Sequence, residues 1–267
     1  YFGNLSLAYR SVAEYRKAKR ALDQATYYYN SLSGEFATEW TLSKYCYYYS
    51  LMGDSEKLNY RKYLNKTIAI ATRTKNNIAL GHAKLANALY YYQRLLSGYS
   101  LRNLSTALKR FRQTNDRDDI VDSLRLLTMI HIEKGDLDEA QKAVTEARQI
   151  FDEIHCDYLK PQLLLAEGAL ARAHHSSDAE PKLQEALKTS KKMFTREYTW
   201  QIQRELALYH KDKGELHKAL QYYRDAIDMI KEITETIDGD EVKSSYLALP
   251  FRKRVFDEIK ELKKLLH

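Results

Sequence analysis

Residues 134–154 read KGDLDEAQKAVTEARQIFDEI, and residues 213–233 read KGELHKALQYYRDAIDMIKEI. Both stretches open with Lys, Gly and an acidic residue, and their glycines, Gly135 and Gly214, lie 79 residues apart. Each stretch also carries two alanines seven residues apart, Ala140 with Ala147 and Ala219 with Ala226. The spacing of the glycines therefore predicts two periods of about forty residues each.

The pair of residues seven apart recurs at this period along the whole chain. The other copies are Ala18 with Ala25, Leu58 with Asn65, Ser100 with Ala107, and Ala179 with Ala186. About twelve residues before each pair lies a second column, Ser6, Cys46, Ala88, Thr128, Gly168 and Ala207. Short side chains at fixed places let helix backbones approach closely. Each repeat is therefore predicted to contain a first and a second helix, with turns at Gly53, Gly135 and Gly214.

These columns resemble the tetratricopeptide repeat family. The family pattern of leucine, small residue and aromatic on the first helix is matched at Leu127, Thr128 and His131, and again at Leu206, Ala207 and His210. The resemblance covers nearly all of the chain, and its period near forty is similar to that of arrays in bacterial signalling and transcription regulators. It implies an all-α, right-handed superhelical solenoid of about six helix pairs in residues 1–238, with a concave face lined by first helices.

The tail, residues 239–267, departs from the repeat. Pro250 suits the first turn of a helix. An apolar stripe follows at Val255, Ile259, Leu262 and Leu266. We expect a helix that caps the last repeat, because the terminal repeat of an array has an uncovered apolar face. The alternative is a helix that connects to a further domain, since a chain beginning at Tyr1 is expected to be a piece of a longer protein.

The sequence has no recognisable catalytic, cofactor or metal motif. Phosphate-binding glycine loops, dinucleotide fingerprints, the zincin motif and paired C-x-x-C are all missing, so we expect no enzyme and no cofactor. His174 and His175 are interpreted as a solvated loop, although a metal site is the alternative. Cys46 and Cys156 lie in different repeats, which disfavours a disulfide and fits the cytoplasm.

Charge and hydropathy restrict the partners. The net charge of +7 permits an acidic partner. Basic clusters fall on the predicted second helices and are interrupted by acids, which disfavours nucleic-acid binding. No run of 18 apolar residues occurs, so no membrane span is expected.

The predicted binding site follows from the helix register. Residues one and four after the small residue of each first helix, and three before it, should face the concavity. The partner-binding residues expected on this basis are Tyr47, Leu89, Tyr92, Arg125, Met129, Arg172, Arg204 and Lys211. Arginine in these columns would grip a carboxylate, so the ligand should be a helix or extended segment, apolar at one end and acidic at the other.

Three functions remain open on the sequence alone. The leading interpretation is a protein- or peptide-binding scaffold within a larger, bacterial regulator. A second is a sensor of a small ligand or signalling peptide whose superhelix changes curvature on binding. A third is a passive structural or dimerisation arm. The 22 tyrosines suit binding surfaces, yet Tyr49 and Tyr91 occupy an aromatic column that is expected to pack in the core.

Overall fold

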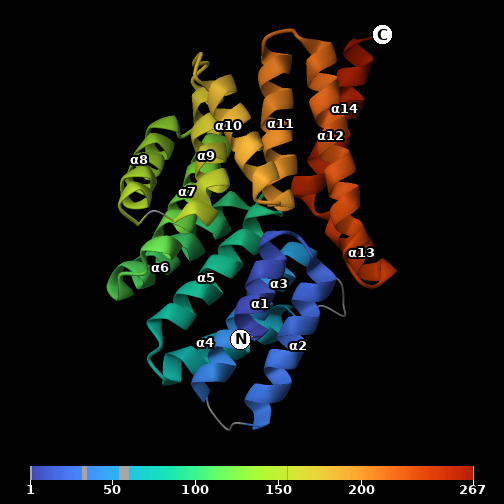
Figure 1. The fold of residues 1–267 in the computed structure, drawn as a ribbon. Helices are drawn as coiled ribbons and strands as arrows, with labels where there is room; N and C mark the ends of the chain where they lie inside the picture. Colours follow the sequence, from blue (N-terminus) through green and yellow to red (C-terminus); the bar gives the residue numbers. More distant parts are fainter. Residues whose placement is uncertain (1, 32–34, 54–59, 155, 267) are drawn as a thin grey trace. The chain divides into compact units, whose positions relative to one another are not determined.

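The protein is helical throughout the part of the chain that the structure describes (Figure 1). The computed structural model describes residues 2–31, 35–53, 60–154 and 156–266. Within these residues it contains fourteen α-helices and one short 3-10 helix, and no strand. The predicted all-α class is therefore confirmed.

The chain forms two compact units. Unit 1 comprises residues 1–119 and 234–249, and unit 2 comprises residues 120–233 and 250–267. Two helices, α7 (Arg117–Lys134) and α12 (Leu216–Glu235), contribute residues to both units. None of these boundaries falls at residue 238, and the division of the chain into repeats and tail stays a prediction.

Unit 1 contains the helices α1 to α6 and one helix of the tail. They are α1 (Phe2–Ser11), α2 (Tyr15–Ser31), α3 (Glu35–Met52), α4 (Tyr60–Arg73), α5 (Asn77–Tyr92), α6 (Ser97–Thr114) and α13 (Asp240–Ala248). Helix α3 packs against α1, α2, α4, α5 and α13. It therefore lies at the centre of this unit.

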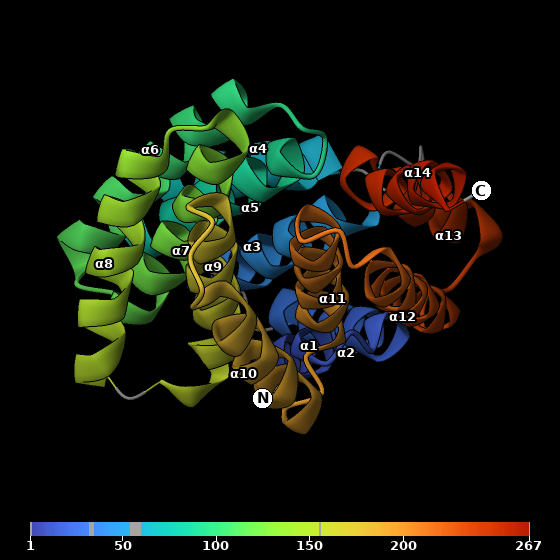
Figure 2. The same ribbon diagram turned by 90° about the horizontal axis from the view of Figure 1, so that it is seen from above.

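Unit 2 contains most of α7 and α12, five further α-helices and one 3-10 helix. They are α8 (Leu137–Ile154), the 3-10 helix η1 (Asp157–Leu159), α9 (Lys160–Ala173), α10 (Ala179–Lys192), α11 (Arg196–Asp212) and α14 (Pro250–Leu265). Helices α9, α10 and α11 pack on one another and lie next to one another in Figure 2. One core cluster, which includes Leu164, Leu183 and Leu206, joins these three helices.

Small residues lie buried on the first helices, as predicted. All six members of that column are buried, namely Ser6, Cys46, Ala88, Thr128, Gly168 and Ala207. A β-carbon on Gly168 of α9 would lie 2.6 Å from Leu183 Cδ2 of α10, so these helices are too close for a larger residue. Ser100 of α6 suits such a contact because its hydroxyl donates a 2.7 Å hydrogen bond to the Ala88 carbonyl of α5.

The second helix of the second repeat departs from the predicted register. Leu58 lies outside the described residues, and Asn65 of α4 is exposed. Tyr60 and Thr67 are buried instead, two positions later, and the Thr67 hydroxyl lies 3.5 Å from Cys46 Sγ of α3. The prediction for Asn65 was wrong because a fixed interval ignores the length of the connection that precedes α4.

The turns after the helices use left-handed backbone. Gly53, Gly135 and Gly214 have φ of +93°, +78° and +76°, in agreement with the turns predicted at these residues. A side chain in this region costs about 1–2 kcal/mol, so glycine is favoured there. Six non-glycine residues in the described part of the chain nevertheless have positive φ, namely Ala13, Lys75, Leu95, Asn115, His175 and Phe194.

The tail contains two helices, where the sequence predicted one. Helix α14 begins at Pro250 as expected, and its stripe residues Val255, Ile259 and Leu262 are buried. Helix α13 was missed because Tyr246 is its one buried residue, which leaves no periodic stripe to detect. The ring centroid of Tyr246 lies 6.1 Å from that of Tyr15 on α2, so α13 packs within unit 1.

Candidate partner-binding face

The predicted site residues all lie on first helices. We call the surface formed by α7, α9 and α11 in unit 2, and by α1, α3 and α5 in unit 1, the first-helix face of that unit. Unit 2 holds Arg125 and Met129 on α7, Arg172 on α9, and Arg204 and Lys211 on α11. Each unit therefore carries its own part of the predicted site.

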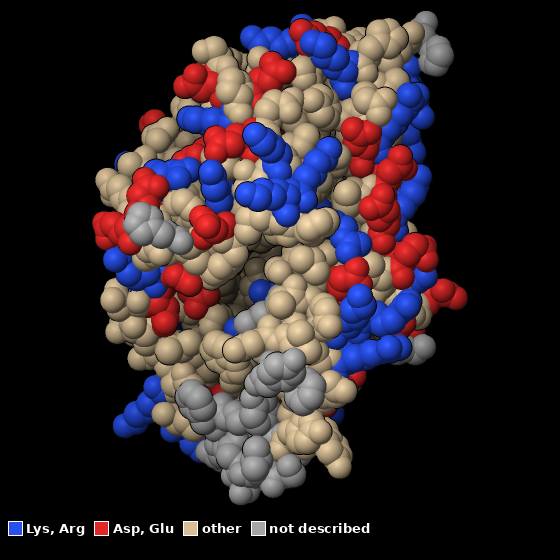
Figure 3. Space-filling view, viewed as in Figure 1, with Lys and Arg blue, Asp and Glu red and all other residues tan. Residues whose placement is uncertain are grey.

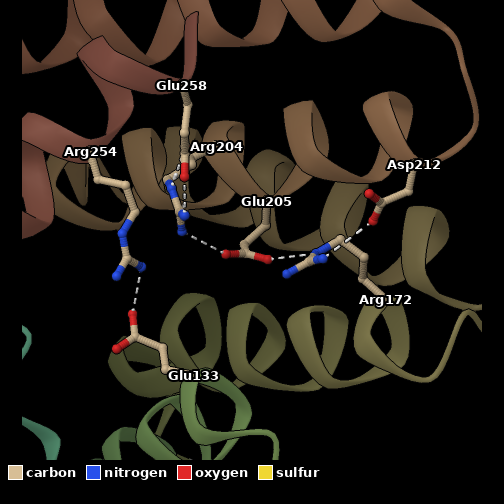
Figure 4. Close-up of polar contacts among 7 residues, drawn as sticks. All are labelled: Glu133, Arg172, Arg204, Glu205, Asp212, Arg254 and Glu258. Carbon is tan, nitrogen blue, oxygen red and sulfur yellow. Dashed lines mark hydrogen bonds and ion pairs between the residues drawn. The ribbon is translucent and has the colours of Figure 1, made fainter. Parts of the chain in front are cut away.

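Two of the predicted arginines meet at one carboxylate. Glu205 of α11 accepts hydrogen bonds from Arg172 Nε at 2.9 Å and from Arg204 Nη1 at 3.2 Å (Figure 4). Arg172 also donates to Asp212 at 3.3 Å. These guanidinium groups thus already hold carboxylates of their own chain, which the sequence columns did not predict.

Helix α14 supplies the strongest of these contacts. Arg204 is 8% exposed and binds both oxygens of Glu258, with Nε to Oε2 at 2.9 Å and Nη2 to Oε1 at 2.5 Å. Burial alone would lower the pKa of Arg204, but the hydrogen bonds and charge of Glu258, with the charge of Glu205, outweigh it and raise this pKa. The pair is therefore a bidentate contact between α11 and α14.

Other contacts hold α14 along α11. Its Arg252 is buried and donates to Glu197 Oε1 of α11 at 3.0 Å. The rings of Phe251 and Trp200 have centroids 5.4 Å apart. Helix α14 thus contacts α11 through apolar and charged groups alike.

One further contact reaches from α14 to α7. Arg254 donates to Glu133 Oε1 at 3.0 Å (Figure 4). Burial raises the pKa of Glu133, and the charge of Arg254 opposes that rise. The first-helix face of unit 2 is therefore covered, along α11 and up to α7, by the chain's own C-terminal helix.

The remaining predicted residues of unit 2 do not join this network through the contacts described. Arg125 is buried, donates to Asp122 at 2.8 Å and to the Tyr198 hydroxyl at 3.2 Å. Met129 is buried. Lys211 is half-buried and has no carboxylate within 4.0 Å among the described residues, so it is the member of the set most open to a ligand.

In unit 1 the predicted residues differ in exposure. Leu89 and Tyr92 are buried, whereas Tyr47 is half-buried and carries the guanidinium of Arg10 at 3.8 Å from its ring centroid. Tyr49 is buried and packs on Tyr63, as its place in the aromatic column predicted.

Beside Tyr47 lies a lysine that the columns did not select. Lys44 of α3 is 6% exposed, and its Nζ lies 3.9 Å from the ring centroid of Trp40. The detectable signal was one basic residue in the otherwise uncharged run TLSKYCYYY, on a helix with little polar surface. Such a lysine is buried by neighbouring helices, which a single-helix pattern does not reveal.

The basic clusters of the second helices are interspersed with acids. Lys19 of α2 lies 2.9 Å from Asp23, Lys17 lies 3.4 Å from Glu14, and Arg16 pairs with Asp238. On the face drawn in Figure 3, acidic side chains lie close to the groups of basic ones. The basic cluster of α2 is therefore paired with acidic residues.

His174 and His175 are exposed at the end of α9, and no group of three or more potential metal ligands occurs among the described residues. No helix in the described part of the chain is both long and apolar enough to cross a bilayer.

Comparison of the sequence with family models and with curated proteins gives no match.

Proposed function

We propose that this protein is a scaffold of the tetratricopeptide type, in a larger bacterial regulator of the cytoplasm, that binds a segment of another protein on its first-helix face. The observation that supports this most strongly is α14. The first-helix face of unit 2 already accommodates a helix, with apolar packing and a bidentate arginine–carboxylate pair. A partner segment would use the same two kinds of contact.

The chemistry of α14 defines what such a segment should look like. Val255, Ile259 and Leu262 make a buried stripe at helical spacing, and Glu258 beside it meets Arg204. This is the apolar and acidic combination that the columns of the sequence suggest for a ligand. Helix-in-groove recognition depends on apolar anchors with this spacing, and charge fixes the register.

A selection of helical peptides displayed on phage, made on the immobilised chain, tests the proposal. Recovered peptides should share a stripe at i, i+4 and i+7 with glutamate or aspartate next to it. Their affinity should fall by at least about tenfold, or 1.4 kcal/mol, in Lys211→Glu, because Lys211 lies two turns beyond Arg204 on the same side of α11.

The matched control is Lys191→Glu, which makes the same charge change at an exposed position on the second helix α10. This variant should bind the selected peptides as the unaltered chain does. Peptides without a common pattern, or an equal loss of affinity in both variants, would contradict binding on the first-helix face.

A further inference from the structure

The ammonium group of Lys44 is buried, and a buried ammonium normally has a counter-ion. It is 6% exposed, and among the described residues no carboxylate lies within 4.0 Å of its ammonium group. Its close neighbour is the face of the Trp40 ring. Buried lysines are ordinarily paired, because removing an ammonium from water is costly. This position therefore lacks the anion that such a burial calls for.

Arg10 of α1 is a second cation of the same kind. It is half-buried, lies over the ring of Tyr47, and also has no carboxylate within 4.0 Å among the described residues. The charge of Arg10 acts on Lys44, since it is one of the causes that lower the pKa of that lysine. Two cations on neighbouring first helices of unit 1 thus share a region walled by aromatic rings.

The other groups around the pair do not neutralise it. His82 of α5 is buried, and burial, then Lys44 and Arg10, hold its pKa well below the usual value, so it is a neutral imidazole. Asp119 lies 3.3 Å from His82 Nε2 and acts on Lys44 only from a distance beyond ion-pair contact. Glu39 of α3 is engaged by Thr74 and Asn76.

We propose that Arg10 and Lys44 form a binding site for a doubly charged oxyanion, of which the phosphate of a monoester is the simplest example. Arginine offers a planar pair of donors and lysine a point charge, which together suit tetrahedral oxyanions. The rings of Trp40 and Tyr47 hold both cations in place. The inference rests on the proposed function in one respect, that the ligand carrying the oxyanion approaches the first-helix face.

Binding should be linked to protonation of Lys44. Burial, with the charge of Arg10, lowers the pKa of Lys44 to about 7 against the opposing charge of Asp119. An anion favours the ammonium form and raises this pKa, so binding above pH 7 takes up a proton. The affinity should accordingly fall as the pH rises through 7 and 8.

Sulfate is the appropriate probe because it keeps two negative charges across this pH range. Titration of the intact chain with sodium sulfate is followed by Trp40 fluorescence and by calorimetry in two buffers of different ionisation enthalpy. We expect saturable binding with proton uptake. The affinity should fall at least about tenfold in Lys44→Met and in Arg10→Gln, and should stay unchanged in Lys62→Met, an exposed control on α4.

Two results would overturn the site: no saturable sulfate binding by the unaltered chain, or equal binding by Arg10→Gln and Lys62→Met. Arg10→Gln keeps the test decisive if Lys44→Met does not fold. Acetate, at matched ionic strength, should bind more weakly, and equal binding would contradict the preference for a double charge. Because no peptide is present, sulfate binding distinguishes this site from partner binding, which fails or succeeds separately in the peptide selection.

Discussion

The two units carry cations on the same kind of helix but treat them differently. In unit 2, Arg172 pairs with Glu205, and Arg204 pairs with Glu205 and Glu258, so both guanidinium groups face carboxylates. In unit 1, Arg10 and Lys44 lie on aromatic rings instead. The difference teaches that a basic residue in a predicted binding column is informative only when its acidic partners are known. Unit 2 pairs Arg172 and Arg204 with its own carboxylates, whereas Arg10 and Lys44 of unit 1 have no such partner among the described residues.

The largest effect is expected from breaking the internal pair of unit 2. Glu258→Ala leaves the buried Arg204 with Glu205 alone, and breaking such a pair costs about 3–5 kcal/mol. Denaturant unfolding measures this loss. Glu261→Ala on the same helix removes an exposed pair with Lys264 and should cost at most about 1 kcal/mol. Similar losses in both variants would mean that α14 is not held through Arg204.

Stability should depend on pH through Lys44 of unit 1, which has no carboxylate partner of the kind that Arg204 has in unit 2. Lys44 has a folded pKa of about 7, below its unfolded value of about 10.4. Between these values the unfolded chain binds more protons, so stability rises with pH by up to about 1.4 kcal/mol per pH unit. Below pH 7 the cost of the buried charge is present in full. Lys44→Met should remove this rise, and an identical pH dependence in both proteins would contradict a buried, unpaired ammonium.

Close helix packing at small residues should contribute to the stability of both units. Gly168→Ala in unit 2 places a β-carbon 2.6 Å from Leu183, and Gly81→Ala in unit 1 places one 2.5 Å from the Phe111 ring. Each should lower the unfolding free energy by about 1–3 kcal/mol. Gly98→Ala on α6 meets nothing within 4 Å and should raise it by up to about 1 kcal/mol. If all three alanine variants had the same unfolding free energy, close helix packing would not be the reason for glycine at positions 81 and 168.

The smallest change in unfolding free energy is expected from substitutions in the turns of the two units. Phe194 of unit 2 and Leu95 of unit 1 have φ of +55° and +58°, and Phe194 is 70% exposed. Phe194→Gly should gain about 1 kcal/mol by relieving the left-handed backbone, whereas the half-buried Leu95 loses packing when replaced by glycine. Phe194→Ala keeps the strain and serves as the control. A gain in Phe194→Ala as large as in Phe194→Gly would point to the exposed ring instead.

The sequence predicts features that depend on neighbours along the chain, and it misses contacts between residues that are far apart along the chain. The column from Ser6 to Ala207 was found because close helix approach demands short side chains at a regular interval. Asn65 was misplaced because connection length breaks that interval. The pairing of Arg204 with Glu258 was missed because α11 and α14 are far apart along the chain, and this pairing depends on tertiary packing. The superhelix and its concave face stay predictions.

The most direct test of the contrast is an NMR titration of the Lys44 Cε resonance, with and without sulfate. We predict a titration midpoint near pH 7 without sulfate and a clearly higher midpoint with it. The side-chain resonances of Arg204 should not respond to sulfate, because Glu258 already occupies that guanidinium. A Lys44 midpoint near 10.4, the value of a solvated lysine, or one that sulfate leaves unchanged, would contradict a cation site open to an external anion.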